Sequence, residues 1–302
     1  MKYAKLGRSD LMVSRISFGA MSLDADDPLA KKILHQALES GINFFDTADL
    51  YQDGRNETLI GEAFSGMRDR VILASKVGNR MRPDGSGWDW VPDPAYILSA
   101  IEASLRRLKT DYIDLYQLHG GTMEDPIDEI IYTFDKLKSE GKIRYYGISS
   151  IRPVVIREYL KKSSITSVMS QYSLLDRRPE ETVFPLLRES QTGVLVRGAL
   201  ARGLLVGKPA AAYLNHPAAD VSRAAELIRE ATIPPHRPYD TAVQFVLSEP
   251  AVGTAVIGIR TEAQLQDALM AADSSSLHED QVQHLKNGFP QNRYTDHRWC
   301  RY

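Results

Sequence analysis

Four side chains that can exchange protons, Asp46, Tyr51, Lys76 and His119, could form one reaction site. Asp46, Lys76 and His119 each end a strongly apolar run, and Tyr51 follows Asp46 by five residues. Taken alone, Asp46 would cap a turn, Lys76 would extend to solvent and His119 would pack in the core. A charged group after a buried strand is unfavourable unless it is paired. The repeated placement therefore favours a shared site.

The chemistry that suits these four groups is proton donation to a carbonyl oxygen. A phenol has a pKa of about 10, and a nearby ammonium ion lowers that pKa by stabilising the phenolate. We expect Lys76 to act on Tyr51 in this way, with Asp46 keeping the lysine charged and oriented. A neutral His119 ring would donate a hydrogen bond to the same oxygen. Tyr51 is thus predicted to be a general acid.

The elements that position these groups alternate between short apolar runs and helical patterns. Strands are predicted at 15–20, 42–48, 71–77, 112–119, 144–150, 167–173, 193–200 and 254–259. Helices are predicted at 28–40, from 57, at 94–108, at 127–139, from 153, at 180–190, 218–231, 239–248, 261–272 and from 276. Strands that are apolar on both faces and alternate with helices indicate a parallel sheet. Eight such units predict an α/β fold, a (β/α)8 TIM barrel.

Three further segments are expected around the barrel. Residues 2–14 should form an N-terminal β-hairpin, and 201–237 should form an extended segment after the seventh strand. A C-terminal helix and an aromatic, basic tail (287–302) should follow the eighth unit. We expect residues 1–302 to form a single domain, because the sequence contains no obvious linker or repeat.

Composition excludes several classes of function. The 302 residues are 43% hydrophobic and 25% charged, with a formal net charge of -2. This balance gives no electrostatic reason to expect a nucleic-acid or membrane partner. No apolar run reaches the roughly 20 residues that span a bilayer. The single cysteine, Cys300, fits a reducing compartment, so a cytoplasmic protein is expected.

Seven segments spread over nearly the whole chain resemble the aldo-keto reductase family. They are DTADLYQDGRNE (46–57), ILASKVG (72–78), LKTDYIDLYQLHG (108–120), IRYYGISS (143–150), QYSLLDRR (171–178), GLLVGK (203–208) and VIGIRTEAQL (256–265). The resemblance implies NADPH-dependent reduction of small aldehydes or ketones, with alcohol oxidation as the reverse reaction. It also implies that Asp46, Tyr51, Lys76 and His119 are the catalytic residues, with Tyr51 as the acid.

The same resemblance assigns residues to the NADPH/NADP+ cofactor, although the chain has no Gly-rich dinucleotide motif. Ser149 and Gln171 would hold the nicotinamide carboxamide, and the loop 198–205 would wrap the pyrophosphate. The residues implied around the nicotinamide ribose, the carboxamide and the pyrophosphate are Gly19, Ala20, Met21, Asp46, Ser149, Gln171, Arg197, Gly198, Leu200, Gly203 and Leu204.

The adenosine 2'-phosphate would be bound near the eighth strand by Gly258, Arg260 and Gln264. This segment opens a helix, and a helix N-terminus favours an anion. The alternative is that Thr261 and Gln264 form only a capping box. In that case Arg260 carries the phosphate assignment.

Four features depart from the usual pattern of the family. Ser150 stands where an asparagine is common, and Arg197 stands where an aromatic ring often stacks on the nicotinamide. A planar guanidinium can also stack, so Arg197 stays a candidate. Residues 120–122 (GGT) replace an aromatic residue after the histidine, which predicts a wider pocket or one that other loops complete. Ala268 replaces an asparagine at the adenine, which leaves Asp267 as the candidate.

Two aromatic segments have open roles. In GWDW (87–90), Trp88 is expected to line the substrate pocket, or else Trp88 and Trp90 pin the loop to the barrel. The tail at 287–302 would dock over the site, against another subunit, or on neither. A monomer or a weak homo-oligomer is expected.

Three other functions compete with carbonyl reduction. A Schiff-base aldolase needs a neutral lysine, which an aspartate partner disfavours. A metal-dependent hydrolase needs a His-x-His motif or a cluster of ligands at the strand ends, where His119 is the one histidine; no metal is therefore predicted. A nicotinamide-binding regulatory or redox-sensing subunit with slow turnover is the third alternative.

Overall fold

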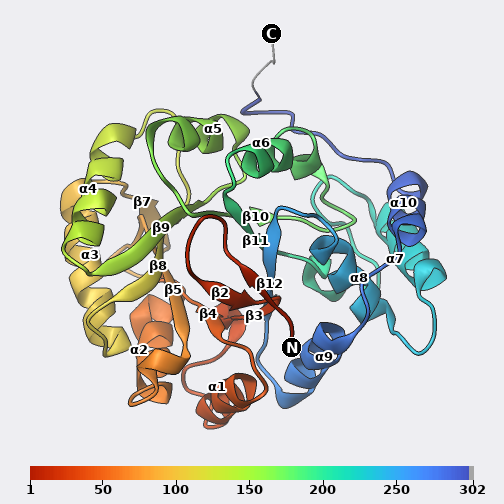
Figure 1. The fold of residues 1–302 in the computed structure, drawn as a ribbon, viewed down its shortest axis with the longest axis horizontal. Helices are drawn as coiled ribbons and strands as arrows, with labels where there is room; N and C mark the ends of the chain where they lie inside the picture. The colour runs from red at the N-terminus through yellow and green to blue at the C-terminus, as the bar shows by residue number, and fades with distance from the viewer. Residues whose placement is uncertain (299–302) are drawn as a thin grey trace.

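The computed structural model describes residues 1–298, in which eight parallel strands close into a barrel (Figure 1). Around the barrel the strands run β3, β4, β5, β8, β9, β10, β11, β12, and β12 pairs with β3 to close the ring. Their bounds are β3 (Ile16–Gly19), β4 (Phe44–Asp46), β5 (Ile72–Val77), β8 (Ile113–Leu118), β9 (Ile143–Ser149), β10 (Ser167–Gln171), β11 (Gly193–Arg197) and β12 (Val252–Gly258). The predicted TIM barrel is confirmed, since each predicted strand coincides with a barrel strand.

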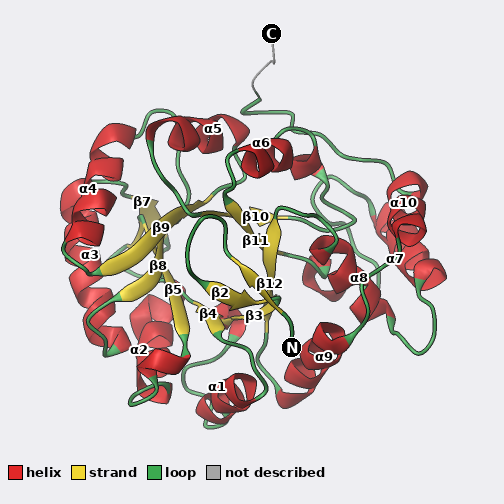
Figure 2. Ribbon diagram, viewed as in Figure 1, coloured by secondary structure: helices red, strands yellow, loops and turns green. Residues whose placement is uncertain are grey.

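Helices form an outer ring around these strands (Figure 2). They are α1 (Ala30–Glu39), α2 (Arg55–Ala63), α3 (Pro94–Leu108), α4 (Ile127–Ser139), α5 (Pro153–Lys162), α6 (Val183–Glu189), α7 (Ala218–Ala231), α8 (Pro238–Leu247), α9 (Glu262–Asp273) and α10 (Glu279–Gly288). Helix α3 shows why such segments begin where they do. Asp93 caps its first turn by accepting from the Tyr96 N–H at 2.9 Å, and Pro94 occupies the first helical position, where no N–H is needed.

Several predicted elements are shorter than expected, and two of them show the reason. The strand predicted at 193–200 ends at Arg197, and Gly198 turns away with a φ of 77°. The helix predicted at 180–190 begins at Val183, because a 3-10 turn, η4 (Arg178–Glu180), precedes it. In both cases a turn contains the end residues that the prediction had assigned to the element.

The N-terminal hairpin closes one end of the barrel. Strands β1 (Tyr3–Lys5) and β2 (Met12–Ser14) pair antiparallel, which confirms the predicted hairpin. Figure 1 shows the hairpin lying across the middle of the ring of strands. Its Leu6 and Leu11 are buried with Phe44 and Leu195 in the cluster that fills the barrel interior. Because this hairpin covers the N-terminal ends of the strands, a site must lie at their C-terminal ends.

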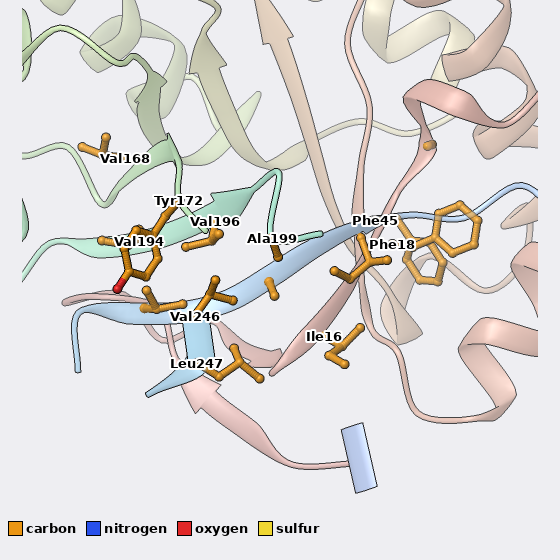
Figure 3. Close-up of a cluster of buried hydrophobic side chains, with 14 of the residues drawn as sticks. Ile16, Phe18, Phe45, Val168, Tyr172, Val194, Val196, Ala199, Val246 and Leu247 are labelled. Carbon is orange, nitrogen blue, oxygen red and sulfur yellow. The ribbon is translucent and has the colours of Figure 1, made fainter. Parts of the chain in front are cut away.

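A second layer of apolar side chains lies between the strands and the helices. Figure 3 shows part of it, with Phe18 and Phe45 side by side and Val196 near Val246 of α8. The Phe18 and Phe45 ring centroids are 5.7 Å apart. Burying each such side chain contributes about 1.5–3 kcal/mol. This packing fixes the strands and therefore the side chains at their ends.

The loop after β5 contains a hairpin that the sequence did not predict, β6 (Asn79–Met81) paired with β7 (Trp88–Trp90). Trp90 holds it down. Its ring lies so close to Gly78 that a Cβ there would be 2.6 Å from the ring, and one on Gly120 would be 3.1 Å away. The Trp90 indole N–H also donates to Asp125 at 2.9 Å. Trp90 therefore pins this loop beside β5 and β8.

The C-terminal segment after α10 packs along the barrel edge. Buried Arg177 donates to the carbonyl oxygens of Lys286 and Phe289, at 2.8 and 3.0 Å. The extended segment after β11 contains a 3-10 turn, η5 (Ala201–Gly203), and α7. Residues 299–302 of the predicted tail, with Cys300, lie outside the described residues.

Candidate active site

Asp46, Lys76 and His119 meet at the C-terminal ends of three neighbouring strands. Asp46 is the last residue of β4, Lys76 is next to last in β5, and His119 directly follows β8. The strands lie in the order β4, β5, β8 (Figure 1). The side chains of Lys76 and Asp46 are only 1% and 5% exposed. The sequence prediction that these residues converge is confirmed.

Lys76 binds three oxygen atoms through its ammonium group. Its Nζ donates to Asp46 Oδ2 at 2.7 Å, to the Thr47 carbonyl oxygen at 2.7 Å and to the Tyr51 hydroxyl at 3.3 Å. An ammonium group has three N–H donors, so each has a partner. The Thr47 contact was missed at the sequence level, because a backbone acceptor leaves no signal in residue type.

The Tyr51 turn brings the phenol over this ammonium group. Tyr51 opens η2 (Tyr51–Gly54), in which Gln52 and Asp53 have positive φ values of 50° and 54°. The Gln52 side chain accepts from the Ala25 N–H at 3.0 Å, which ties the turn to the loop after β3. Nζ of Lys76 lies 5.0 Å from the Tyr51 ring centroid. Because the Tyr51 oxygen accepts from Lys76 and none of residues 1–298 accepts from Tyr51, the phenol hydrogen is available to a ligand.

The acidity of the phenol differs from the sequence expectation. Burial raises the pKa of Tyr51 above its ordinary value, and Lys76, which favours the phenolate, only partly offsets this effect. The expectation that Lys76 would bring this pKa down is therefore wrong as a net shift. Burial opposes the charged form of Lys76 as well, but Asp46 and Tyr51 outweigh it and hold the pKa of Lys76 above its usual range. The site therefore holds a protonated phenol beside a charged ammonium group.

His119 is a neutral ring next to the phenol. Its centroid lies 5.9 Å from that of Tyr51, with the rings edge to face. Burial, followed by the charges of Lys76 and Arg197, lowers the pKa of His119 to about 3. Its Nδ1 is buried and has no hydrogen-bond partner among the described residues. A neutral imidazole carries one N–H, so His119 can donate one hydrogen bond.

Ser149, Gln171 and Arg197 end the next three strands, β9, β10 and β11. Gln171 and Arg197 are directly paired in the sheet, and the Arg197 guanidinium donates to Gln171 Oε1 at 2.7 Å. Arg197 is exposed and near enough to Tyr51 and His119 to lower the pKa of both. The residues predicted to bind the nicotinamide end of the cofactor thus lie at the strand ends that follow those of Asp46, Lys76 and His119 around the barrel.

Glycines leave backbone open where a cofactor could approach closely. Gly198 and Gly203 have φ values of 77° and 90°, which favour glycine. A Cβ on Gly198 would lie 3.2 Å from the Gln171 side chain. Gly258 pairs with Gly19 across β12 and β3, so no side chain rises from either strand end there. Leu200 and Leu204 flank η5, Ala20 is buried after Gly19, and Met21 is 65% exposed.

The predicted phosphate-binding residues lie at the start of α9. The Thr261 hydroxyl accepts from the Gln264 N–H at 3.2 Å, and the Gln264 side chain accepts from the Arg260 N–H at 3.0 Å. Thr261 therefore caps α9, but the Gln264 side chain bonds the N–H of Arg260 and not that of Thr261, so only half of the predicted capping box is present. The Arg260 side chain is exposed and makes no ion pair within residues 1–298. Asp267, the predicted adenine contact, pairs with Arg237 at 2.5 Å.

The described residues lack two other kinds of feature. Within residues 1–298 there is no group of three or more His, Cys, Asp and Glu residues that could hold a metal ion. None of the described helices is both long enough and apolar enough to cross a membrane. Trp88, predicted to line the substrate pocket, is 56% exposed on β7.

Comparison with known proteins finds similarity along almost the whole chain. The model of the Aldo/keto reductase family matches residues 15–287. The uncharacterized oxidoreductase YqkF of Bacillus subtilis is 47% identical over 307 residues, covering 99% of this chain and 100% of the relative. The holo form of aldo-keto reductase AKR11C1 from Bacillus halodurans is 48% identical, with a TM-score of 0.94 over 99% of this chain and 100% of its own. Glycerol dehydrogenase AKR11B4 from Gluconobacter oxydans is 26% identical, with a TM-score of 0.84 over 95% and 94%.

Proposed function

The chain belongs to the aldo/keto reductase family, and on that premise we propose that it reduces aldehydes or ketones to alcohols with NADPH, using Tyr51 as the general acid. The hydrogen bonding of Lys76 carries this proposal. All three of its N–H donors are committed, and the longest bond, at 3.3 Å, ends on the Tyr51 oxygen. Tyr51 therefore keeps its own O–H for a substrate oxygen.

The electrostatics suit proton donation at neutral pH. Burial keeps Tyr51 protonated, so its proton is present when a carbonyl binds. Lys76 then stabilises the phenolate that proton transfer leaves behind. His119, neutral because its pKa is about 3, donates a hydrogen bond to the same oxygen and stabilises the charge that develops there. The reverse reaction, alcohol oxidation, would use the phenolate as the base.

The strand ends fit a nicotinamide cofactor, which supplies the hydride when bound. Ser149 and Gln171 offer polar groups to a carboxamide, and the open backbone at Gly198 and Gly203 lets a pyrophosphate approach. The exposed guanidinium of Arg260, beside the N-terminus of α9, suits a 2'-phosphate. This guanidinium is our reason for preferring NADPH to NADH. We assign Trp88 to the apolar wall of the substrate pocket.

The state of Lys76 disfavours the Schiff-base alternative. A lysine that attacks a carbonyl must be neutral, yet Asp46 and Tyr51 hold the pKa of Lys76 above its usual range. Its Nζ is also enclosed by three oxygen acceptors.

The direct test is consumption of reduced cofactor over a panel of aliphatic and aromatic aldehydes and ketones. We expect NADPH oxidation that depends on the carbonyl and is slower with NADH at equal subsaturating concentration. A fluorescence titration should accompany the assay. Tight NADPH binding without turnover on any carbonyl would favour the regulatory or redox-sensing alternative, and binding of neither cofactor would refute the proposal.

A further inference from the structure

The amide of Gln171 is held from both sides. Its Nε2 donates to Asp176 Oδ2 at 2.9 Å, and its Oε1 accepts from the Arg197 guanidinium at 2.7 Å. Nε2 also approaches the Tyr213 hydroxyl at 3.4 Å. An amide in this position could otherwise present either its oxygen or its NH2 group to a ligand.

The two charged neighbours decide which end faces which way. An ionised carboxylate only accepts hydrogen bonds, so the NH2 group of Gln171 must face Asp176. A guanidinium only donates, so the oxygen must face Arg197. The oxygen is therefore the group that Gln171 presents at the C-terminal end of β10, two residues beyond Met169, which pairs with Ser149 of β9.

Asp176 is itself fixed in place. It is 1% exposed, and Arg178 binds both of its oxygens, each at 2.7 Å. Its backbone exchanges two hydrogen bonds with Ser173, at 3.0 and 3.2 Å, which close the turn after β10. Asn292, from the segment after α10, reaches Oδ1 at 3.4 Å. A buried carboxylate held in this way does not rotate to follow Gln171, so Gln171 must follow it.

We propose that Asp176 is a positioning residue for the cofactor, because it fixes the Gln171 amide so that its oxygen accepts from the NH2 group of the nicotinamide carboxamide. The inference rests on the proposed function, since it requires a nicotinamide at this site. It also gives the C-terminal segment a role. Asn292 accepts from the Arg177 N–H at 2.8 Å and joins that segment to the turn that carries Asp176.

The test compares two ligands that differ only in the group Gln171 would bind. NADPH contains the nicotinamide, whereas 2'-phospho-ADP-ribose lacks it but keeps the adenosine, the phosphates and both riboses. Dissociation constants are measured by fluorescence for NADPH and by calorimetry for both ligands. Asp176→Asn should weaken NADPH about tenfold, the effect of losing one charge-assisted hydrogen bond, and change 2'-phospho-ADP-ribose less than about twofold.

Asp114 offers a matched control. It is also 1% exposed and pairs with two arginines, Arg68 and Arg144, each at 2.7 Å, but it lies near the start of β8, away from the site. Asp114→Asn therefore removes a similar buried charge and should change neither dissociation constant. A loss of NADPH binding in this control equal to that in Asp176→Asn would overturn the inference.

A second variant tests whether Asp176 acts through Gln171. Exchanging the pair, Gln171→Glu with Asp176→Asn, keeps the net charge, a hydrogen bond between the two side chains and an acceptor facing the carboxamide. The double variant also keeps a carboxylate near Arg178. It can therefore test the inference even if Asp176→Asn alone folds poorly. NADPH binding should return to within about threefold of wild type.

Other outcomes besides a loss in the control would also overturn the inference. They are unchanged NADPH binding in Asp176→Asn, equal weakening of both ligands, and an exchanged pair that binds NADPH no better than the single variant. Wild-type protein that binds 2'-phospho-ADP-ribose but gains nothing from the nicotinamide would also refute it. Wild-type protein that binds neither ligand would refute the proposed function instead, and the positioning role with it.

Discussion

Replacing Lys76 by methionine should destabilise the fold as well as stop catalysis. The side chains of Lys76 and Asp46 are 1% and 5% exposed, and they meet at 2.7 Å. Asp46 Oδ1 already has no hydrogen-bond partner within residues 1–298, so removing the ammonium would leave the carboxylate buried and unpaired. Breaking a buried pair from one side costs about 3–5 kcal/mol. A domain is stable by only about 5–15 kcal/mol, so the loss should be large.

Urea unfolding followed by circular dichroism measures this effect, with Asp46→Asn as the compensating change. Adding Asp46→Asn to Lys76→Met removes the unpaired buried charge of the carboxylate, so most of the lost free energy of unfolding should return. Carbonyl reduction should not return, because Tyr51 would still lack its ammonium partner.

The pH dependence of the deficit follows from the same charge. Burial raises the pKa of Asp46, and Lys76 is the group that opposes this shift. Without Lys76 the folded-state pKa of Asp46 should rise further above its unfolded value. The Asp46 contribution to stability is then present at low pH and lost as pH rises through the folded-state pKa. The deficit of Lys76→Met should therefore be largest at neutral pH. A deficit that is independent of pH and is not relieved by Asp46→Asn would refute the reasoning.

Two further predictions concern the cofactor and the imidazole. Arg260→Ala should raise the NADPH dissociation constant about ten- to a hundredfold, the value of one guanidinium–phosphate contact, and leave that of NADH nearly unchanged in fluorescence titrations. The wild-type preference should shrink as salt rises, and equal weakening of both cofactors would contradict the role of Arg260. Because the pKa of His119 is about 3, its ring should stay neutral between about pH 5 and 8. The profile of kcat/KM against pH should therefore have the same shape in wild type and in His119→Gln over this range. A change of kcat/KM with pH in that range that occurs only in wild type would show that His119 titrates there.

Much of the fold could be predicted because its signals are local and repeated. The eight barrel strands coincide with eight apolar runs, and the hairpin around Gly7 coincides with its turn signal. The strands β6 and β7 were missed because each has three residues, within a stretch rich in Gly and Pro. What holds them is Trp90 packed on Gly78 and Gly120, a contact between distant residues that no local pattern encodes.

Some features of the site could likewise be predicted from the sequence, and others could not. The positions of Asp46, Lys76 and His119 follow from strand ends, so sequence and barrel geometry suffice. The direction of the Tyr51 pKa does not follow, because burial depends on how the surrounding elements pack and here exceeds the effect of Lys76. Asp176 lies in the segment 171–178, which resembles the aldo-keto reductase family, but its residue type and spacing alone predict no role for it. Its contact with Gln171 depends on the turn after β10.

The measurement that tests the central claim most directly is the turnover of Tyr51→Phe together with its affinity for NADPH. The phenylalanine keeps the ring and removes only the hydroxyl that receives the third bond of Lys76. We predict that carbonyl reduction falls by far more than tenfold in kcat, that is, by more than about 1.4 kcal/mol in transition-state stabilisation, while the NADPH dissociation constant stays within about twofold of wild type. A variant that keeps more than about a tenth of the wild-type kcat would contradict the assignment of Tyr51 as the acid.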